Sequence, residues 1–360
     1  MNPKIVCGAS KTRLFTMSSI FGIGQIPHEK IKDVITRSSI GALLLNLMKK
    51  YWFIVSLLLV VAITVVDPTE TVSSVGKWLK NHKGPDAVIV LIFFFSGLIL
   101  NARQIKSGLM DVEGILIALI IIFVLAPIAA AAFGMTPLDT GIKIGIFLVA
   151  VMPTTLSSGV VMSGAAGGNM AHALVITILA NTLAVFTIPV ALSLLLTLIG
   201  ESTFVSIHKS AIMIKLGLLV LLPLCSGLLI KFYTRSLIDQ FTPKLQTLNQ
   251  CLVLGIVWMA MSQARGVIMN SGGKIGTVLL LVLVFHGILL ACSGLLTGVF
   301  KIGKGRRESV IFMGSQKTLP LSIILQVSLF PEYGLALVVC VMHHLIHLLM
   351  DGYLVGKLRE

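Results

Sequence analysis

The stretch that decides the fold is Met152-Pro153-Thr154-Thr155-Leu156-Ser157-Ser158-Gly159, a polar interruption of the apolar segment 141–165. A second interruption, Gly314-Ser315-Gln316-Lys317-Thr318-Leu319-Pro320, lies inside the apolar segment 308–330. In lipid every backbone N–H and C=O must be satisfied within the protein, so a broken helix persists only where it lines an internal cavity. Two such breaks in matching halves of a chain are typical of the substrate site of a secondary transporter.

The composition predicts a membrane protein whose partner is the lipid bilayer. Hydrophobic residues make up 56% of the chain and charged residues 12%, with a mean hydropathy of +1.01. Soluble domains carry about 25% charged residues. The net charge of +14 is explained by basic loops beside the membrane and by contact with anionic lipid. We therefore expect no nucleic-acid partner.

The apolar segments predict an all-α membrane protein with about ten transmembrane helices, the fourth and ninth of them broken. They lie at 49–66, 86–102, 114–134, 141–165, 170–198, 210–232, 246–269, 275–300, 308–330 and 332–356. Short links follow both broken segments, which favours two repeats of five helices. An odd number of spans per repeat gives the second repeat inverted topology.

The chain therefore divides into a basic N-terminal tail at 1–47, a first five-helix repeat at 48–200 and a second at 208–357. Most Lys and Arg residues fall on the side of the N-terminus, so we expect both termini to be cytoplasmic. The membrane expected is the bacterial inner (plasma) membrane. Residues 31–37 fit a short amphipathic surface helix, and a disordered tail or a later start site fits the same stretch.

The first break supplies hydroxyl groups near mid-membrane depth. Pro153 opens the helix, and Thr154, Thr155, Ser157 and Ser158 follow it. The half-helix that begins near Ser157 presents free N–H groups and a positive dipole end, which favour an anion. The alternative is a proline kink whose hydroxyls bond back to their own helix.

Two residues of the fifth segment, Thr177 and Asn181, are candidates to face the first break. They lie one turn apart on the segment that follows it. Polar side chains inside a membrane span are expected to face the bundle interior.

The second break carries a charge in the middle of a span. Lys317 stands between Gln316 and Thr318, with Ser315 before them and Pro320 after them. A lysine at that depth costs about 3 kcal/mol on insertion scales, so a functional role is the first hypothesis. The alternative is a shorter span with Lys317 reaching the interface. Lys317 is a candidate fixed cation, anion hook or proton carrier.

The tenth segment places His344, His347 and Asp351 on one helix face, with His343 at i, i+4 spacing from His347. A zinc protease motif is excluded, because position 344 holds His where the general-base Glu is required. A proton relay or polar cavity lining and plain interhelical hydrogen bonds are equally favoured. We expect neither an enzyme nor a metal site nor another bound cofactor.

These residues resemble the bile acid:sodium symporter superfamily, and most closely its SBF-like branch of plant chloroplast and animal solute-carrier-10 member 7 types. The resemblance rests on 152–160, 167–169, 315–320, Phe95–Leu100 and His344 with Asp351. It implies a ten-helix fold with a panel domain and a core domain. In that fold the broken fourth and ninth helices cross in the core.

The resemblance also implies sodium sites that this chain preserves only in part. Ser158 matches a sodium ligand, but Gly159 stands where the classical branch has Asn, and Ala173 where it has Ser. Thr177 fits a further ligand position. The run 315–317 lacks the acid of the classical motif, and Ile122 replaces a Gln of the third helix. The second sodium site is therefore expected to be absent and the first impaired.

The sequence thus predicts a symporter-like secondary transporter for a small organic anion, working by alternating access with Na⁺ or H⁺ as the coupling ion. Lys317 is the hypothetical substitute for the lost cation, and its replacement by Gln or Met is expected to abolish pH-dependent uptake. The alternative is a non-transporting membrane regulator of ion or calcium homeostasis. Carboxylates, sulfonates and steroids all fit the pattern, and the oligomeric state stays open.

Overall fold

A computed structural model describes residues 52–100, 108, 111–200, 208–234, 238–270 and 272–359. The chain divides into two compact units, Met1–Trp52 and Phe53–Glu360, and the described residues after Trp52 all belong to the second unit. The predicted tail 1–47 and its candidate helix 31–37 lie outside the described residues. The described residues form helices and connecting loops without a strand, which confirms the all-α prediction.

Seven helices in the described part of the chain are long and apolar enough to cross a membrane, or eight if one bent pair forms a single span. Two shorter apolar helices, Gly84–Ile99 and Thr140–Val151, accompany them. The helices are Trp52–Val66, α2 (Thr71–Asn81), α3 (Gly84–Ile99), α5 (Val112–Ile120), η1 (Ile121–Leu125), α6 (Ala126–Gly134), α7 (Thr140–Val151), α8 (Ser158–Ala165), α9 (Met170–Leu198), α10 (Lys209–Leu216), η3 (Gly217–Leu221), α11 (Leu222–Tyr233), α13 (Thr242–Asn270), α14 (Gly272–Val299), α15 (Arg306–Ser315), α16 (Leu319–Leu329) and α17 (Gly334–Arg359).

Both predicted breaks are present, and proline chemistry explains where each half-helix ends or begins. α7 stops at Val151 because Met152 precedes Pro153 and takes an extended conformation, with φ −70° and ψ 146°. α15 stops at Ser315, and Gln316 is likewise extended, with φ −70° and ψ 147°. α16 then starts at Leu319 with Pro320 in its first turn, where a missing N–H costs nothing.

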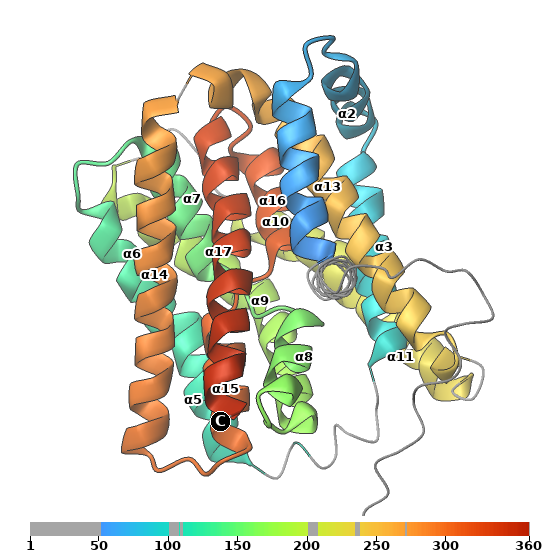
Figure 1. The fold of residues 1–360 in the computed structure, drawn as a ribbon, viewed down its shortest axis with the longest axis vertical. Helices are drawn as coiled ribbons and strands as arrows, with labels where there is room; N and C mark the ends of the chain where they lie inside the picture. The colour runs from blue at the N-terminus through green and yellow to red at the C-terminus, as the bar shows by residue number, and fades with distance from the viewer. Residues whose placement is uncertain are drawn as a thin grey trace, which may run out of the picture. The chain divides into compact units, whose positions relative to one another are not determined.

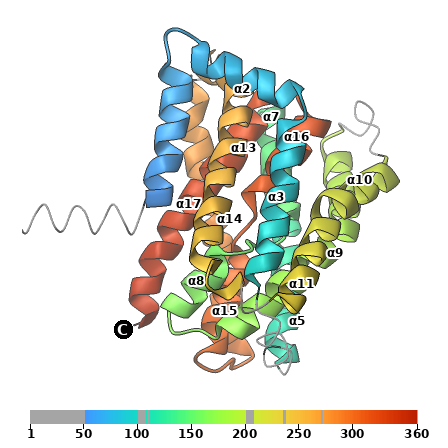
Figure 2. The same ribbon diagram turned by 90° about the vertical axis from the view of Figure 1, so that its right-hand side faces the viewer.

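The helices pack in two groups within the second unit (Figures 1 and 2). We name α2, α3, α10, α11 and α13 the panel helices, and α5 to α9 with α14 to α17 the core helices. α3 contacts both α11 and α13, and the three lie side by side in Figure 2. In the core, α17 packs against α7 and α14, while α15 packs against α8 and α5. The two broken helices therefore belong to one group.

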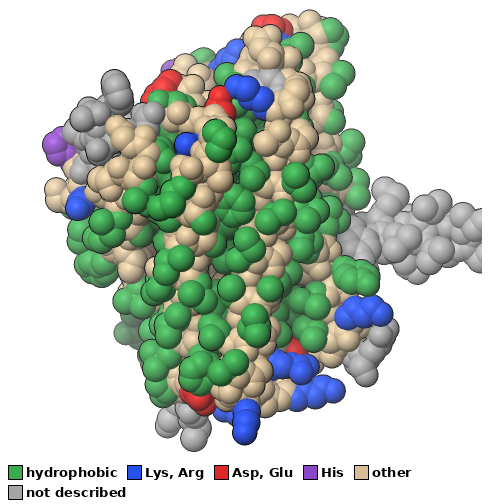
Figure 3. All heavy atoms as spheres, turned by 90° about the vertical axis from the view of Figure 1, so that its left-hand side faces the viewer, with side chains coloured by type: hydrophobic (Ala, Val, Ile, Leu, Met, Phe, Trp, Pro, Cys, Tyr) green, Lys and Arg blue, Asp and Glu red, His purple; other side chains and the backbone are tan. Residues whose placement is uncertain are grey.

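The surface has the polarity of a membrane protein. On the face drawn in Figure 3, hydrophobic side chains cover the middle, while Lys, Arg, Asp and Glu side chains gather toward the two ends. Several large apolar side chains of α14 are well exposed, among them Leu280, Leu295 and Val299. Exposed apolar area of this extent requires lipid as the surrounding solvent, so the chain is an integral multi-pass membrane protein.

A buried arginine holds the 105° bend between Trp52–Val66 and α2. Arg265 of α13 donates to the carbonyls of Val65 (3.3 Å) and Asp67 (2.8 Å) and to the Glu70 carboxylate (2.6 Å). In the same loop, hydrogen bonds from the Thr69 hydroxyl and the Val72 amide hold the pKa of Asp67 below its usual value. These contacts tie the helix Trp52–Val66 to α13, which is one of the panel helices.

We predict that Gly97→Ala loosens the contact between α3 and α11. A Cβ at Gly97 would lie 2.3 Å from the Leu224 carbonyl oxygen and 2.9 Å from the Leu228 nitrogen, both backbone atoms. Overpacking of this kind costs about 1–3 kcal/mol, so the thermal midpoint in detergent should fall. Gly255→Ala in α13, which meets no atom within 4 Å, is the control and should leave the midpoint unchanged or raise it. Equal thermal midpoints for the two variants would show that α3 and α11 accommodate the added methyl group without loss of stability.

Candidate functional site at the crossing of the broken helices

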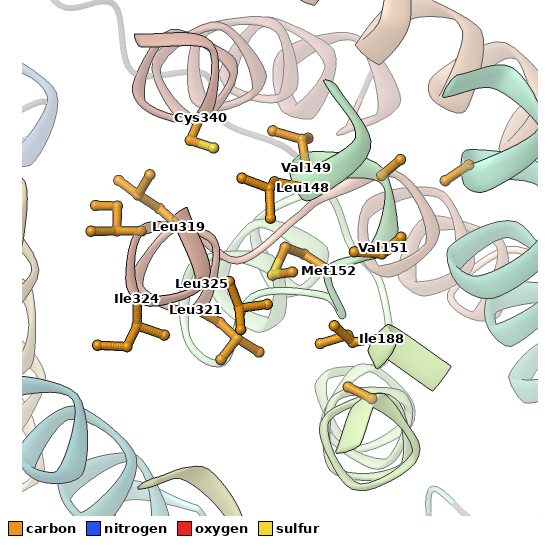
Figure 4. Packing of buried hydrophobic residues seen from close by; sticks show 14 of the residues in the cluster. Leu148, Val149, Val151, Met152, Ile188, Leu319, Leu321, Ile324, Leu325 and Cys340 are labelled. Atoms are coloured by element: carbon orange, nitrogen blue, oxygen red, sulfur yellow. The ribbon is translucent and has the colours of Figure 1, made fainter. Parts of the chain in front are cut away.

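The two breaks touch each other. The Thr318 amide donates to the Pro153 carbonyl at 3.0 Å, so the extended segments are joined by a main-chain hydrogen bond. Figure 4 shows Met152 at the end of α7 next to the packed side chains of α16, among them Leu321 and Leu325. Residues far apart in the sequence thus form one buried centre.

Lys317 lies at that centre with 2% of its surface exposed. Its Nζ donates to the carbonyls of Ile122 (2.9 Å), Ala150 (3.0 Å) and Met152 (3.0 Å). Two of these carbonyls belong to the C-terminal end of α7, where the last carbonyls of a helix lack an intrahelical donor. The negative end of a helix dipole also favours a cation. The ammonium therefore has a full set of acceptors, and Lys317 does not reach the interface.

The third acceptor exists because of a short π-helix. In η1 the Ala126 amide donates to Ile121, five residues back. The corresponding donor for Ile122 is residue 127, which is Pro127 and has no N–H. The Ile122 carbonyl is thereby left free for Lys317. Sequence reasoning assigned no function to Ile122, because its apolar side chain gives no sign that its backbone takes part.

Gln316 links both breaks to α17. Its Oε1 accepts from the hydroxyls of Thr155 (2.7 Å) and Ser158 (3.3 Å), and its Nε2 donates to Asp351 Oδ2 (2.7 Å). Gln316 and Asp351 are fully buried. The Gln316 side-chain amide thus connects Thr155 and Ser158 of the first break to the Asp351 carboxylate of α17.

The predicted residues of α9 do reach the first break. Thr177 Oγ1 lies 3.5 Å from the Thr155 carbonyl and donates to Ala173 at 2.9 Å. Asn181 Nδ2 lies 3.4 Å from the Thr154 carbonyl. The Asn181 amide, which has two N–H groups, thus provides a donor for a carbonyl of the broken helix, whereas the hydroxyl proton of Thr177 is used within α9.

Ser315 differs from the other candidates because it bonds to its own helix. Its hydroxyl donates to the Ile311 carbonyl of α15 at 2.8 Å. This is the local back-bonding that the sequence analysis gave as the alternative for hydroxyls near a break. Among the predicted site residues, Ser315 therefore lies next to the second break, but its hydroxyl bonds within α15.

A cavity of about 70 Å³ lies between the panel helices and the crossing. Predicted site residues line it from both breaks and from α17: Thr155, Ser157, Ser158, Thr318, Pro320 and His344. Residues that the sequence analysis did not select complete the lining, namely Phe53, Ile92, Ser96, Leu156, Asn249, Gln250, Val253 and Leu319. The buried Asn249 amide donates to Ser96 Oγ at 3.0 Å. An asparagine inside an apolar span was the signal that could have found this side of the cavity.

Of the two histidines predicted for the site, one borders the cavity and one does not. His344 lines it and packs edge-on against Phe53, with ring centroids 6.1 Å apart. His347 lies behind His344, 4.5 Å away between ring centroids, and is fully buried. Within the described residues, no group of three or more His, Cys, Asp or Glu side chains is arranged to hold a metal ion.

We predict that Lys317→Met destabilises the protein by about 2–5 kcal/mol, because it leaves three buried carbonyls without their donor. The Met side chain keeps much of the volume, so loss of hydrogen bonds is the main change. Lys143→Met, on the partly exposed side of α7, is the control and should change stability little. Thermal unfolding in detergent measures both, and equal stability of the two variants would contradict the assigned contacts.

Comparison with known proteins agrees with this architecture. The sequence model of the SBF-like CPA transporter family matches residues 51–360. Sodium/bile acid cotransporter 7 of Xenopus tropicalis is 27% identical over 332 residues, covering 88% of this chain and 94% of its own length. Probable sodium/metabolite cotransporter BASS4, chloroplastic, of Arabidopsis thaliana is 30% identical over 280 residues, covering 74% of this chain and 64% of its own length. The chain belongs to the SBF-like CPA transporter family, and is a transporter and not an enzyme.

Proposed function

We propose that this protein is a secondary active transporter for a small organic anion, working by alternating access. The observation that carries the proposal is the cavity at the crossing, on which the N-terminal ends of two half-helices, α8 and α16, both open. The relatives' names, sodium/bile acid and sodium/metabolite cotransporter, support a small solute that moves together with an ion.

The chemistry of the cavity favours a negative charge on the solute. The positive dipole ends of α8 and α16 lie beside Ser157, Ser158 and Thr318. The hydroxyls of Thr155 and Ser158 lie on the same wall and donate to Gln316 Oε1 in this structure. The apolar side chains Phe53, Ile92 and Val253 on the opposite wall suit a carbon skeleton. A carboxylate or sulfonate attached to an apolar body fits both walls.

Lys317 serves in this proposal as a fixed cation at the place where a coupling sodium ion is lost. Its ammonium supplies a positive charge to the carbonyls at the end of α7, as a bound cation would. The positions where the sodium ligands are missing, Gly159 and Ile122, lie beside this centre. Na⁺ or H⁺ remains the candidate coupling ion, and any such ion must bind at a second place.

The ten-helix arrangement belongs to the same proposal. We infer two inverted five-helix repeats, 48–200 and 208–357, because α7–break–α8 and α15–break–α16 stand at corresponding positions. We also place both termini in the cytoplasm, because the basic residues gather in the loops on that side. The bacterial plasma membrane stays a prediction from sequence, and the plant relatives are named chloroplastic.

The experiment that tests the transporter is uptake of labelled taurocholate and pyruvate into proteoliposomes under imposed Na⁺ or H⁺ gradients. Gradient-driven accumulation of either anion supports the proposal. A membrane regulator of ion or calcium homeostasis is the second candidate, because a lysine and apolar residues occupy the positions of sodium ligands. Absence of uptake under both gradients, with correctly folded protein, would favour that second candidate.

We predict that Asn249→Leu lowers uptake about tenfold or more, because it removes a buried amide that lines the cavity and donates to Ser96 Oγ, while the Ser96 hydroxyl keeps its own bond to the Ile92 carbonyl (2.7 Å). Ser226→Ala is the control, since Ser226 is exposed and bonds to its own helix at Leu222 (2.7 Å). Initial uptake rates, normalised to reconstituted protein, measure the difference. Equal uptake rates for the two variants would show that Asn249 on the α13 side of the cavity takes no part in binding the solute.

A further inference from the structure

Four histidine rings form a closed cluster in the core, which we name the histidine cluster: His286 of α14 and His343, His344 and His347 of α17. His286 lies 5.5 Å from His343 and 5.8 Å from His347, and His347 lies 4.5 Å from His344, measured between ring centroids. Every one of these residues is at least nine-tenths buried. The cluster combines residues of two helices that are far apart in the sequence.

The cluster holds unused hydrogen-bonding capacity. Among the described residues, five of its ring nitrogens are buried without a partner: His286 Nδ1, His343 Nε2, His344 Nδ1 and both nitrogens of His347. Most buried polar atoms in proteins are hydrogen-bonded, and each exception costs about 1–3 kcal/mol. Imidazole nitrogens can donate or accept in hydrogen bonds. An arrangement that is costly for stability therefore points to a functional role for the cluster.

A buried carboxylate completes the site. Asp351 Oδ1 lies 2.9 Å from His286 Nε2, and both residues are fully buried. Lys317 is the cation near the cluster, in the second break. On the helices packed against α17, the charged residues lie toward the helix ends, while α8 and α16 carry none; these residues are Lys143, Lys244, Arg265 and Lys274. With neutral imidazoles the cluster therefore holds one negative charge.

We propose that the histidine cluster and Asp351 form a proton-binding site, and that its proton is the coupling ion of the transporter. The proposal rests on the function proposed above. One proton taken up on Asp351 Oδ2, while His286 Nε2 holds Oδ1, brings the charge of the cluster to zero and crosses the membrane with the solute. Lys317 does not carry this proton, because its three N–H groups are already bound to three carbonyls.

Gln316 connects the proton to the solute cavity. While Asp351 is ionised it accepts from Gln316 Nε2, so Gln316 Oε1 faces Thr155 and Ser158 and uses their hydroxyl protons. A protonated Asp351 Oδ2 is a donor, which favours the opposite orientation of the Gln316 amide. The amide then donates toward Thr155 and Ser158, and their hydroxyls become free to donate to an anion in the cavity. Protonation thus raises the affinity for the anion, and by linkage the anion raises the affinity for the proton.

The first test needs no solute. Potentiometric titration of the purified protein between about pH 5 and pH 8 compares wild type with Asp351→Asn and His286→Gln. We expect Asp351→Asn to take up about one proton fewer than wild type, and His286→Gln, which lacks the ring nitrogen beside Asp351 Oδ1, to take up its proton over a different pH range. Asp86→Asn, at the start of α3 beside Lys215 (3.8 Å), is the control and should match wild type. If a folded cluster variant titrates identically to wild type, the proton site is overturned. His286→Gln keeps the buried carboxylate and is the variant to use if Asp351→Asn does not fold.

The second test separates the proton site from the transport function. Exchange of labelled for unlabelled taurocholate or pyruvate across proteoliposomes needs alternating access but no ion gradient. We expect wild type to exchange one of them faster at lower pH and to accumulate it under an H⁺ gradient, and Asp351→Asn to lose both dependences. Exchange without any effect of pH, or accumulation driven by Na⁺ only, would overturn the proton coupling and leave the transporter standing. Absence of exchange in wild type would instead overturn the transporter, while the titration still decides the proton site.

Discussion

A lysine ammonium surrounded by backbone carbonyls is the interaction on which the centre of this protein depends. Helices that break inside a membrane leave carbonyls without donors, and no water is present to satisfy them. Lys317 satisfies three of them, from the end of α7 and from the π-helix η1. The same contacts keep the charge of the ammonium compensated in a region of low dielectric constant. The break and the buried lysine therefore stabilise each other, although each alone would be unfavourable.

The crossing also separates the two signs of helix dipole. The C-terminal end of α7 meets the ammonium, whereas the N-terminal ends of α8 and α16 line the cavity. In the proposed function, the fixed positive charge takes the place of an exchangeable cation on one side, and the other side attracts an anion. This division gives a physical basis for keeping the crossing of the broken helices where the family resemblance implies that sodium ligands are missing.

A chain of polar side chains joins the cavity to the interior of the core. It runs from Thr155 and Ser158 through Gln316 to Asp351 and then to His286. Each member has a partner on a different helix, so a change at one end alters the donor and acceptor pattern at the other. In a low-dielectric interior such networks are costly when incomplete, which makes the unpartnered histidine nitrogens beside them significant.

The sequence by itself determined the helical class, the membrane environment and the positions of both breaks, because these follow from local composition and from proline geometry. Segment 170–198 coincides with α9, and Pro153 and Pro320 mark the end of α7 and the start of α16. The meeting of the two breaks followed from their matching positions in the two halves of the chain, and the family resemblance added that the broken helices cross. Only the tertiary structure decided the partners of Lys317, since a free carbonyl at Ile122 depends on the π-helix and on Pro127. It also brought Ser96 and Asn249 to the cavity and His286 to Asp351, because contacts between helices far apart in the chain leave no periodic pattern in the sequence.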